Sequence, residues 1–243
     1  MRFFILISLL SFNFIIAAQD PFSVGTWRDH LPYAKINEVV ALDNIYYAAS
    51  PYSIISFNSN ENEIIKWNTI TGLSEVGINS IEVNQNQNTL VVGYQSGNID
   101  VIKNDNIVNM SAILNSGIIG DKSIYELVSH DDFIYVCTGF GIVVIDLKKN
   151  EVKDTYFIGD NNSQVKVFDV HIGQDSIFAA TELGIKAASL LSPFLSDPSV
   201  WNMLHNPTNK VFTKFENIAS AIENRFLIYG TYSSDTSLLI DYN

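Results

Sequence analysis

An internal repeat of about 44 residues is the feature that most restricts how this 243-residue chain folds. Each unit reads as a strand, a polar turn, a second strand, another turn and a third strand, with short β-branched or aromatic runs between Gly, Asn and Asp. The position expected to open the third strand recurs at spacings of 44, 44 and 43 residues: Ser53, Gly97, Gly141 and Gly184. Such a period indicates stacked supersecondary units.

Fixed columns of side chains accompany this period. Small residues are expected at the end of the second strand of each unit: Ala49, Gly93, Cys137, Ala180 and Gly230. Bulky residues stand two and three places earlier: Tyr47, Val91, Tyr135, Phe178 and Ile228, and Tyr46, Leu90, Ile134, Ile177 and Leu227. A small sheet with two apolar faces cannot cover both by itself, so the units must stack, and the small column would let them approach closely.

The repeat therefore predicts an all-β fold, a β-propeller of four-stranded antiparallel blades. The expected blades are 36–75, 76–121, 122–165, 166–209 and a partial fifth, 210–243. Ring closure would remove exposed sheet edges. Because the fifth blade stops in mid-strand, we expect an incomplete ring, and a chain that is the front portion of a longer protein. The prolines at 193 and 198 predict a protruding loop between the third and fourth strands of the fourth blade.

The first 18 residues predict a secretory signal peptide rather than part of the fold. Met1–Arg2 supplies a positive charge, Phe3–Ile16 is almost wholly apolar, and Ala17–Ala18 supplies small residues. Cleavage is expected between Ala18 and Gln19, which leaves 19–243 as the propeller domain. The alternative is a retained membrane anchor, but the run is shorter than the ~20 residues that span a bilayer. The product is expected to be exported, and soluble or peripheral.

Charge and cysteine content exclude several classes of function. The chain has 14 basic and 26 acidic side chains, and a net charge of −12. A nucleic-acid partner is not expected, because such binders need a clustered Lys/Arg surface. A single cysteine excludes an internal disulfide framework and a Cys-rich zinc site.

No catalytic, metal-binding or cofactor-binding constellation is recognisable. None of the four histidines stands at metal-ligand spacing from another: His30, His130, His171 and His205. Cys137 could serve as a nucleophile, but its place in the small-residue column predicts a buried packing role. Asn-rich turns such as 58–63 and 160–162 lack calcium-loop spacing and are expected to be hairpin turns. The acid pair Glu61/Glu63 has no locatable partner for glycosidase chemistry.

Three strings carry a resemblance to a known family. A W-R-D-H-L-P-Y string precedes the first blade: Trp27, Arg28, Asp29, His30, Leu31, Pro32 and Tyr33. Together with the segments 45–52 and 71–75, it resembles the N-terminal β-propeller family of PorZ, a surface component of the type IX secretion system of Bacteroidetes. Ser53 stands where a glycine is usual, and Glu75 stands where an aspartate is commoner.

The resemblance implies a non-enzymatic role at the cell surface, peripheral on the outer membrane. Members are expected to join an attachment complex with a sortase-like protease and its outer-membrane partners, and to bind and present anionic lipopolysaccharide to it. The implied architecture is two propellers followed by a small sandwich-like domain. For the 27–33 string, a strand that completes the last blade is favoured over direct ligand contact.

Two other classes of function remain open on sequence alone. One is a ligand-sensing periplasmic propeller of a hybrid two-component regulator, whose repeats look similar. The other is an enzyme built on a propeller, such as a lyase, a glycosidase or a quinoprotein. The quinoprotein blade signature is missing, and no convergent acid pair is visible.

Overall fold

Short runs of β-branched and aromatic residues, separated by turns of Asn, Asp and Gly, form the strands of this protein. The computed structural model describes residues 31, 33, 35–104, 106–173 and 175–205, and the backbone of the strands in 212–221, 225–232 and 237–242. The expected signal peptide and the 27–30 part of the W-R-D-H-L-P-Y string lie outside the described residues. The residues from Pro32 to Asn243 form one compact unit.

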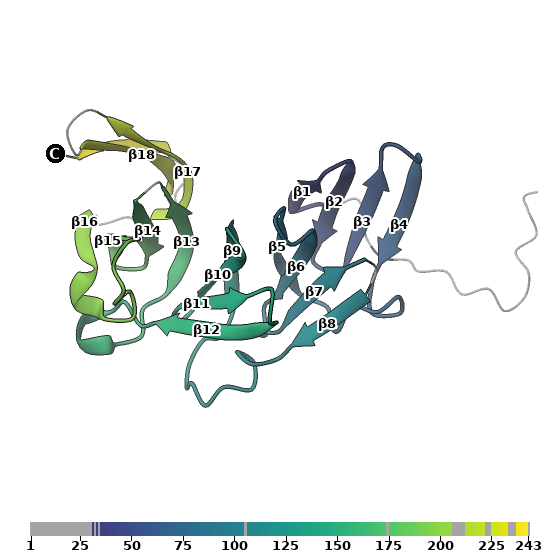
Figure 1. Ribbon diagram of the computed structural model, residues 1–243, viewed down its shortest axis with the longest axis horizontal. Helices are drawn as coiled ribbons and strands as arrows, with labels where there is room; N and C mark the ends of the chain where they lie inside the picture. Colours follow the sequence, from purple (N-terminus) through teal and green to yellow (C-terminus); the bar gives the residue numbers. More distant parts are fainter. Residues whose placement is uncertain are drawn as a thin grey trace, which may run out of the picture. The chain divides into compact units, whose positions relative to one another are not determined.

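The described strands form five antiparallel sheets, which the chain makes one after another (Figure 1). The first sheet is β1 (Glu38–Leu42), β2 (Ile45–Ser50), β3 (Ser53–Asn58) and β4 (Glu63–Trp67). The second is β5 (Ile78–Asn84), β6 (Thr89–Tyr94), β7 (Ile99–Lys103) and β8 (Asn106–Met110). The third is β9 (Ile124–His130), β10 (Phe133–Thr138), β11 (Gly141–Asp146) and β12 (Glu151–Tyr156).

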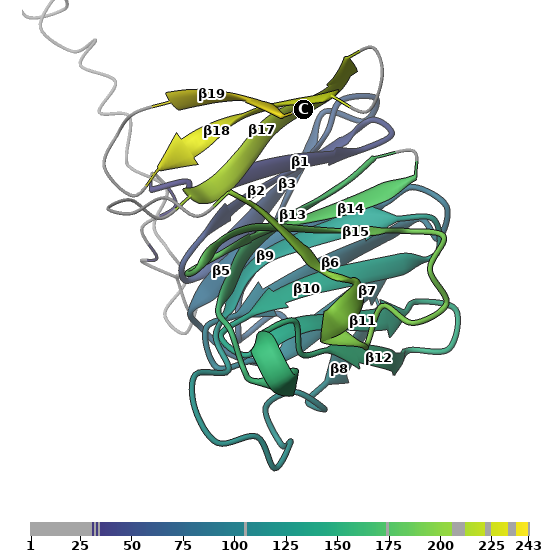
Figure 2. The ribbon, with the colours of Figure 1, turned by 90° about the vertical axis from the view of Figure 1, so that its left-hand side faces the viewer.

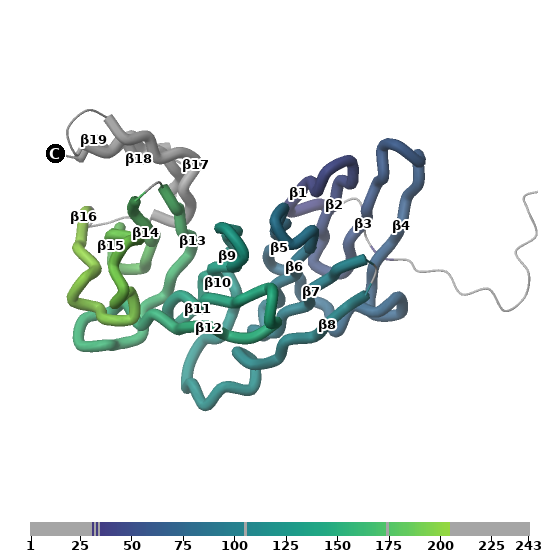
Figure 3. The backbone as a smooth tube through the Cα atoms, viewed as in Figure 1, coloured from purple at the N-terminus to yellow at the C-terminus, as the bar shows by residue number. Residues whose placement is uncertain are grey.

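The fourth sheet is β13 (Val167–Ile172), β14 (Ser176–Thr181), β15 (Gly184–Ser189) and β16 (Asn202–His205). The fifth has three strands, β17 (Phe212–Ala221), β18 (Arg225–Tyr232) and β19 (Ser237–Tyr242). Two single turns of 3₁₀-helix, η1 (Asp160–Asn162) and η2 (Pro198–Val200), complete the described elements. Within every sheet, neighbouring strands are also neighbours in sequence. Figure 3 shows the backbone passing through the first four sheets in the order of the sequence.

Consecutive sheets pack through their first strands, so that β5 lies against β1, β9 against β5, and β13 against β9 (Figure 2). This is the arrangement of propeller blades. Over the described residues, the sheets form an open array of four complete blades and a partial fifth, not a closed ring. The predicted all-β propeller of four-stranded blades is confirmed.

Left-handed turn residues explain where many hairpins fold back. Asp43, Asn88, Asp131 and Asn150 all have φ between 51° and 53°, and each stands in the connection between two paired strands. Asn and Asp tolerate this conformation better than other non-glycine residues. The interpretation of the Asn-rich segments as hairpin turns is right for 58–63, which connects β3 to β4 and has Asn62 at φ 53°. It is wrong for 160–162, which forms η1 between the third and fourth sheets.

The prediction that Gly97 opens the third strand of its blade is wrong. Ser53, Gly141 and Gly184 each pair with the last residue of the preceding strand, as predicted. In the second sheet the turn is one residue longer, and the Tyr94 amide donates to the Asn98 carbonyl at 3.0 Å. Asn98 therefore takes the equivalent position, while Gly97 stays inside the turn with φ +89°.

The small-residue column lies in one register, as predicted. Each member pairs with a branched aliphatic residue on the third strand: Ala49 with Ile54, Gly93 with Ile99, Cys137 with Ile142, Ala180 with Ile185 and Gly230 with Leu238. At Gly93 the reason for the small size is visible. A Cβ there would lie 2.8 Å from Cγ2 of Ile124, on the first strand of the next sheet. The column thus sets how closely adjacent sheets approach.

Three apolar cores fill the spaces between adjacent sheets, and each draws side chains from both. Leu42, Ile54, Ile78 and Ile81 belong to the core between the first and second sheets. Val91, Ile99, Ile124 and Leu127 belong to the next one. Tyr135, Ile142, Val167 and Val170 belong to the core between the third and fourth sheets. Neighbouring sheets thus bury the two faces that no single sheet covers alone.

The proline-containing insertion between β15 and β16 has one face anchored and one face in solvent. The Trp201 indole donates to the Leu195 carbonyl at 2.8 Å, and both side chains are buried. Leu191 and Phe194 are 76% and 65% exposed. The prediction of a protruding loop agrees with these exposures. Within the described part of the chain, no helix has the length and apolarity needed to cross a bilayer.

Replacing Gly93 by valine should lower the free energy of unfolding by about 1–3 kcal/mol, because the added carbons collide with Ile124 and force the second and third sheets apart. Urea denaturation of the full chain measures this. Gly117→Ala is the matched control, because a Cβ at Gly117 meets no atom within 4 Å. Equal stability of the two variants would contradict the assigned role of the small-residue column.

Candidate functional site

The segment Thr71–Glu75, which carries part of the family resemblance, is fastened to the second sheet. Asp100 on β7 is fully buried, and its carboxylate accepts hydrogen bonds from the amide and hydroxyl of Ser74 at 2.8 and 2.6 Å. The Tyr94 hydroxyl donates to the same carboxylate at 2.6 Å, and the Asn109 amide donates at 2.9 Å. Ser96 donates to Glu75 at 2.5 Å. This segment is therefore a structural clamp between the first two sheets.

The clamp also accounts for the state of Tyr94. Burial, and then the hydrogen bond to Asp100, raises the pKa of the Tyr94 phenol well above its usual value. The phenol therefore stays protonated and remains a donor to the carboxylate. A buried carboxylate that accepts several hydrogen bonds is satisfied without a cation.

Replacing Asp100 by alanine should cost about 1–3 kcal/mol of folding stability, because the buried Tyr94 hydroxyl and the Ser74 hydroxyl would lose their acceptor. Urea denaturation of the purified chain gives the value. Glu63→Ala, at an exposed position on the outer strand β4, serves as the control for removal of a carboxylate. A loss no larger than that of the control would show that the clamp contributes nothing.

Of the W-R-D-H-L-P-Y string, the structure describes Leu31 and Tyr33. The ammonium of Lys66, on β4, lies 4.4 Å from the centre of the Tyr33 ring, which is cation–π distance. Tyr33 thus contacts the first blade. The closure role of Trp27, Arg28, Asp29 and His30 remains a prediction, as does cleavage between Ala18 and Gln19, because these residues lie outside the described part.

The structure places the histidines apart. His130 ends β9, with Nε2 3.6 Å from Oδ2 of Asp131. His171 lies on β13, where burial lowers the pKa of its imidazole. His205 ends β16, and His30 is outside the described residues. Among the described side chains, no group of three or more His, Cys, Asp or Glu residues is arranged to hold a metal ion.

Cys137 is a packing residue in the core between the third and fourth sheets. Burial, and then the nearby carboxylates of Asp169 and Glu126, raises the pKa of its thiol well above the usual value. A buried neutral thiol is a poor nucleophile. The interpretation of Cys137 as part of the small-residue column therefore agrees with its surroundings.

Cys137 should not react with iodoacetamide at pH 8 while the protein is folded, because the thiol is buried and protonated. Mass spectrometry before and after addition of urea measures the labelling. A variant with Asn60→Cys, in an exposed turn, gives the rate for an accessible thiol. Labelling of Cys137 in the folded protein at that rate would contradict its assignment to the core.

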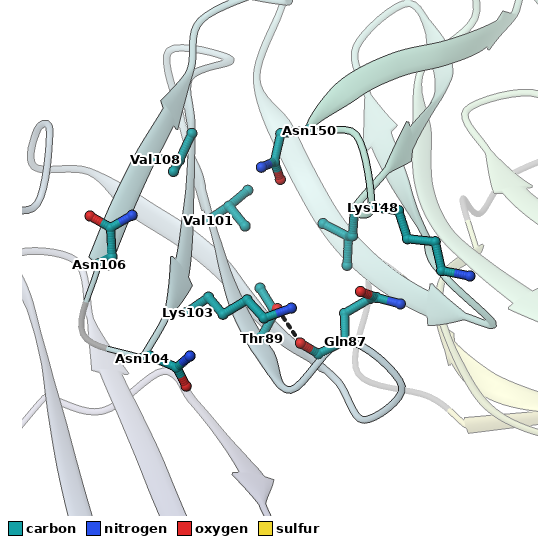
Figure 4. Close-up of a pocket in the computed structure, with 10 residues that line it drawn as sticks. Gln87, Thr89, Val101, Lys103, Asn104, Asn106, Val108, Lys148 and Asn150 are labelled. Carbon is teal, nitrogen blue, oxygen red and sulfur yellow. Dashed lines mark hydrogen bonds between the residues drawn. The ribbon is translucent and has the colours of Figure 1, made fainter.

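A polar groove lies between the second and third sheets, at the end where β5 joins β6 and β7 joins β8 (Figure 4). Its volume is about 450 Å³. Two lysines and four side-chain amides line its walls: Lys103, Lys148, Gln87, Asn104, Asn106 and Asn150. Thr89, Val101, Val108 and Leu147 complete the lining. None of these residues carries a carboxylate.

Hydrogen bonds between the two sheets hold the groove walls in place. The Asn84 amide donates to the Ser129 hydroxyl at 2.9 Å and to the Asp131 carbonyl at 2.8 Å. The Gln87 side chain donates to Asp132 at 2.6 Å. These bonds tie the β5–β6 turn to the β9–β10 turn and so hold the second sheet against the third.

The two lysines of the groove differ in how they are paired. The Lys148 ammonium donates to Asp132 at 2.6 Å, which raises the pKa of the lysine and lowers that of the aspartic acid. Lys103 makes no ion pair with any described residue. Figure 4 shows its side chain extending from β7 toward Gln87 and Thr89. Lys103 is therefore the cation that remains available to a ligand.

Two other hollows are chemically different. One, of about 430 Å³ between the third and fourth sheets, is lined by aromatic residues and by Asp131 and Asp154. There, the Lys153 ammonium lies 3.6 Å from the centre of the Phe133 ring. The other, of about 230 Å³, is mostly apolar and lies under the loop that contains Ile113 and Ile118. The pair Glu61/Glu63 stands in an exposed hairpin and lines none of these hollows.

A sequence match places the chain in a known family. The family model described as "TSS9, PorZ, N-terminal beta-propeller domain" matches residues 45–202. The chain belongs to this family. No relative was found among curated proteins. The match begins after the W-R-D-H-L-P-Y string and includes the Thr71–Glu75 clamp.

Solved structures with the same fold come from several kinds of protein. PorZ of Porphyromonas gingivalis, described as an essential bacterial surface component of the type IX secretion system, is 22% identical, with a TM-score of 0.66 over 84% of this chain and 28% of that one. The extracellular domain of a putative one-component system from B. thetaiotaomicron is 13% identical, with a TM-score of 0.58 over 81% and 26%. Sqt1 of Saccharomyces cerevisiae is 15% identical, with a TM-score of 0.62 over 85% and 59%.

These structural likenesses show the fold and nothing finer. The chain spans less than a third of the P. gingivalis PorZ chain. Sensor-type extracellular domains and a yeast propeller share the same architecture. Family membership therefore rests on the sequence match over residues 45–202.

The polar groove is not predicted from the sequence. Lys103 and Lys148 are distant in sequence, and Lys148 belongs only to the two-residue basic run Lys148–Lys149. Their separation of 45 residues is nevertheless close to one repeat. Residues one repeat apart occupy matching turns of adjacent blades, and that spacing is the signal from which the groove could have been found.

Proposed function

We propose that this chain is the N-terminal propeller of a non-enzymatic surface component of the type IX secretion system, one that scaffolds or presents anionic lipopolysaccharide to a sortase-like partner. The observation that carries the proposal is the match of the PorZ N-terminal propeller model to residues 45–202. The propeller provides a rigid platform whose turns vary while its cores are fixed, which suits a presenting role.

The chemistry of the described residues supports a binding role over a catalytic one. Asp100 is enclosed by structural donors, and Cys137 is buried within a core. The polar groove offers amides and ammonium groups, which hold a ligand but do not by themselves break bonds. An exported component also agrees with the sequence of residues 1–18, which we propose to be removed as a signal peptide before the domain 19–243 folds.

Deletion of the gene in the bacterium that encodes this chain should abolish attachment of secreted cargo to the cell surface. The family resemblance implies that the attachment complex removes a C-terminal signal from exported cargo and joins the cargo to lipopolysaccharide. If the product presents lipopolysaccharide to that complex, cargo in the deletion strain should retain this signal and leave the cell surface. Immunoblots of cell-surface and medium fractions measure this. Return of the intact gene should restore attachment, and a periplasmic reporter should be exported normally throughout.

The same experiment tests the alternative of a ligand-sensing regulator. If the protein is a regulator, deletion of its gene should change the transcript profile. The cargo that the deletion strain still produces should be processed and anchored normally. Unchanged cargo processing in the deletion strain would contradict the proposed function.

A further inference from the structure

We propose that the polar groove between the second and third sheets binds a single anionic group, a carboxylate or a phosphate, carried by a saccharide. The saccharide part rests on the proposed function, since an anionic glycan is the ligand expected there. The anion part rests on the groove itself. Its principal contact is Lys103, with the side-chain amides around it (Figure 4).

The charge of the groove is opposite to that of the chain as a whole. The chain has a net charge of −12, and a surface of that sign repels anions. The groove has two of the 14 basic side chains and no carboxylate among its lining residues. Asp132, a carboxylate beside the groove, is bound by Gln87 and Lys148. A local reversal of charge in a concave site favours an anion there.

The remaining lining groups suit the sugar that carries the anion. The amides of Gln87, Asn104, Asn106 and Asn150 can each donate to and accept from sugar hydroxyls. Val101, Val108 and Leu147 give an apolar surface for the C–H faces of a pyranose ring. Concave sites with an apolar floor and a few placed polar groups are typical of small-molecule binding.

The site is built before any ligand arrives. Thr89 donates from its hydroxyl to the Gln87 carbonyl at 2.9 Å, and both Thr89 and Val101 are buried. The Asn84 and Gln87 bonds between the sheets fix the distance between the walls. Asn104 and Asn150 stand at turn positions with φ of 48° and 53°. Binding therefore requires ordering of lysine side chains, but no rearrangement of backbone.

The other two hollows fit this ligand less well. The hollow between the third and fourth sheets is lined by Asp131 and Asp154, which repel an anion. The hollow lined by Ile113 and Ile118 has no charged side chain. Of the three, the polar groove has the cations without the opposing carboxylates.

The test is titration of the full-length protein with small probes, followed by NMR or calorimetry. Inorganic phosphate and glucuronate are the anionic probes, and glucose is the neutral one. We expect saturable binding of at least one anionic probe, with glucose weaker. Lys103→Gln should weaken it about tenfold, because a charge-assisted hydrogen bond is lost. Lys148→Gln should have a smaller effect, since Asp132 already pairs with that lysine.

Lys149→Gln is the matched control. Lys149 lies in the same turn and has the same charge, but it faces Glu151 at 3.3 Å and does not line the groove. Its replacement should leave the dissociation constant unchanged. An unchanged thermal melting temperature in all three lysine variants, which replace exposed side chains, would show that the fold is intact.

The outcomes separate the sources of the anion. Binding of phosphate alone supports a phosphorylated saccharide, binding of glucuronate alone supports a uronic acid, and binding of both supports the shared chemistry. Absence of saturable binding by either probe, or an equal effect of Lys149→Gln and Lys103→Gln, would overturn the proposed site. If Lys103→Gln abolishes probe binding while cargo attachment persists in cells, the groove is an anion site that attachment does not use, and the saccharide part fails. The proposed function fails separately, only if deletion of the gene leaves cargo attachment unchanged.

Discussion

Burial of both faces of each sheet is the constraint on which this fold depends. A single four-stranded sheet leaves both of its apolar faces in water, so each sheet needs a neighbour on either side. The cores between the first and second, second and third, and third and fourth sheets meet this need in turn. Within the described chain, the structure is therefore a series of dependent layers, and the stability of each sheet resides largely in its interfaces.

In the first sheet, bulky column residues are exposed, because no other described sheet packs on its outer face. Leu90, Ile134 and Ile177 are at most 1% exposed, whereas Tyr46, in the same column, is 48% exposed. Val39 and Ile64 are exposed to a similar or greater degree. Register pairing places Val39 opposite Ala48, and Tyr46 opposite Phe57, so an apolar face is continuous across the strands. The sequence pattern of these residues is that of a packed blade, and their exposure follows from the open array.

The period and the columns could be predicted from sequence because every sheet packs against its neighbours in the same way and so needs the same kinds of side chain at the same positions. Small residues recur where sheets approach, as at Gly93 beside Ile124. The error at Gly97 arose because one extra turn residue changes the register without changing the residue type that a tight turn requires. The polar groove was beyond the same reasoning, since Lys103 and Lys148 obey no packing rule. Whether these two lysines line a common groove depends on which turns lie next to each other in the folded chain.

At one equivalent position on the third strand, the second, third and fourth sheets have an acidic, an apolar and a basic side chain. Asp100, Val143 and Lys186 are equivalent in register, since their partners Val92, Val136 and Ala179 are equivalent on the second strands. Each contacts the loop that enters its own blade. The carboxylate of Asp100 accepts from Ser74, the ammonium of Lys186 donates to the Ile158 carbonyl at 2.6 Å, and Val143 packs beneath the loop of Ile113.

In each of these three sheets, the same position on the third strand contacts the loop that enters the sheet. The type of side chain at that position differs according to the hydrogen-bonding or apolar groups that the loop presents. The turns at the opposite end of the blades need no such contact, because hairpins are held by their own strands. Side chains at that end that make no bond between sheets, such as Lys103, can contact a ligand. This difference places the polar groove at the end where β5 joins β6 and β7 joins β8, and it explains why the structural clamp and the candidate binding groups lie at opposite ends of the second sheet.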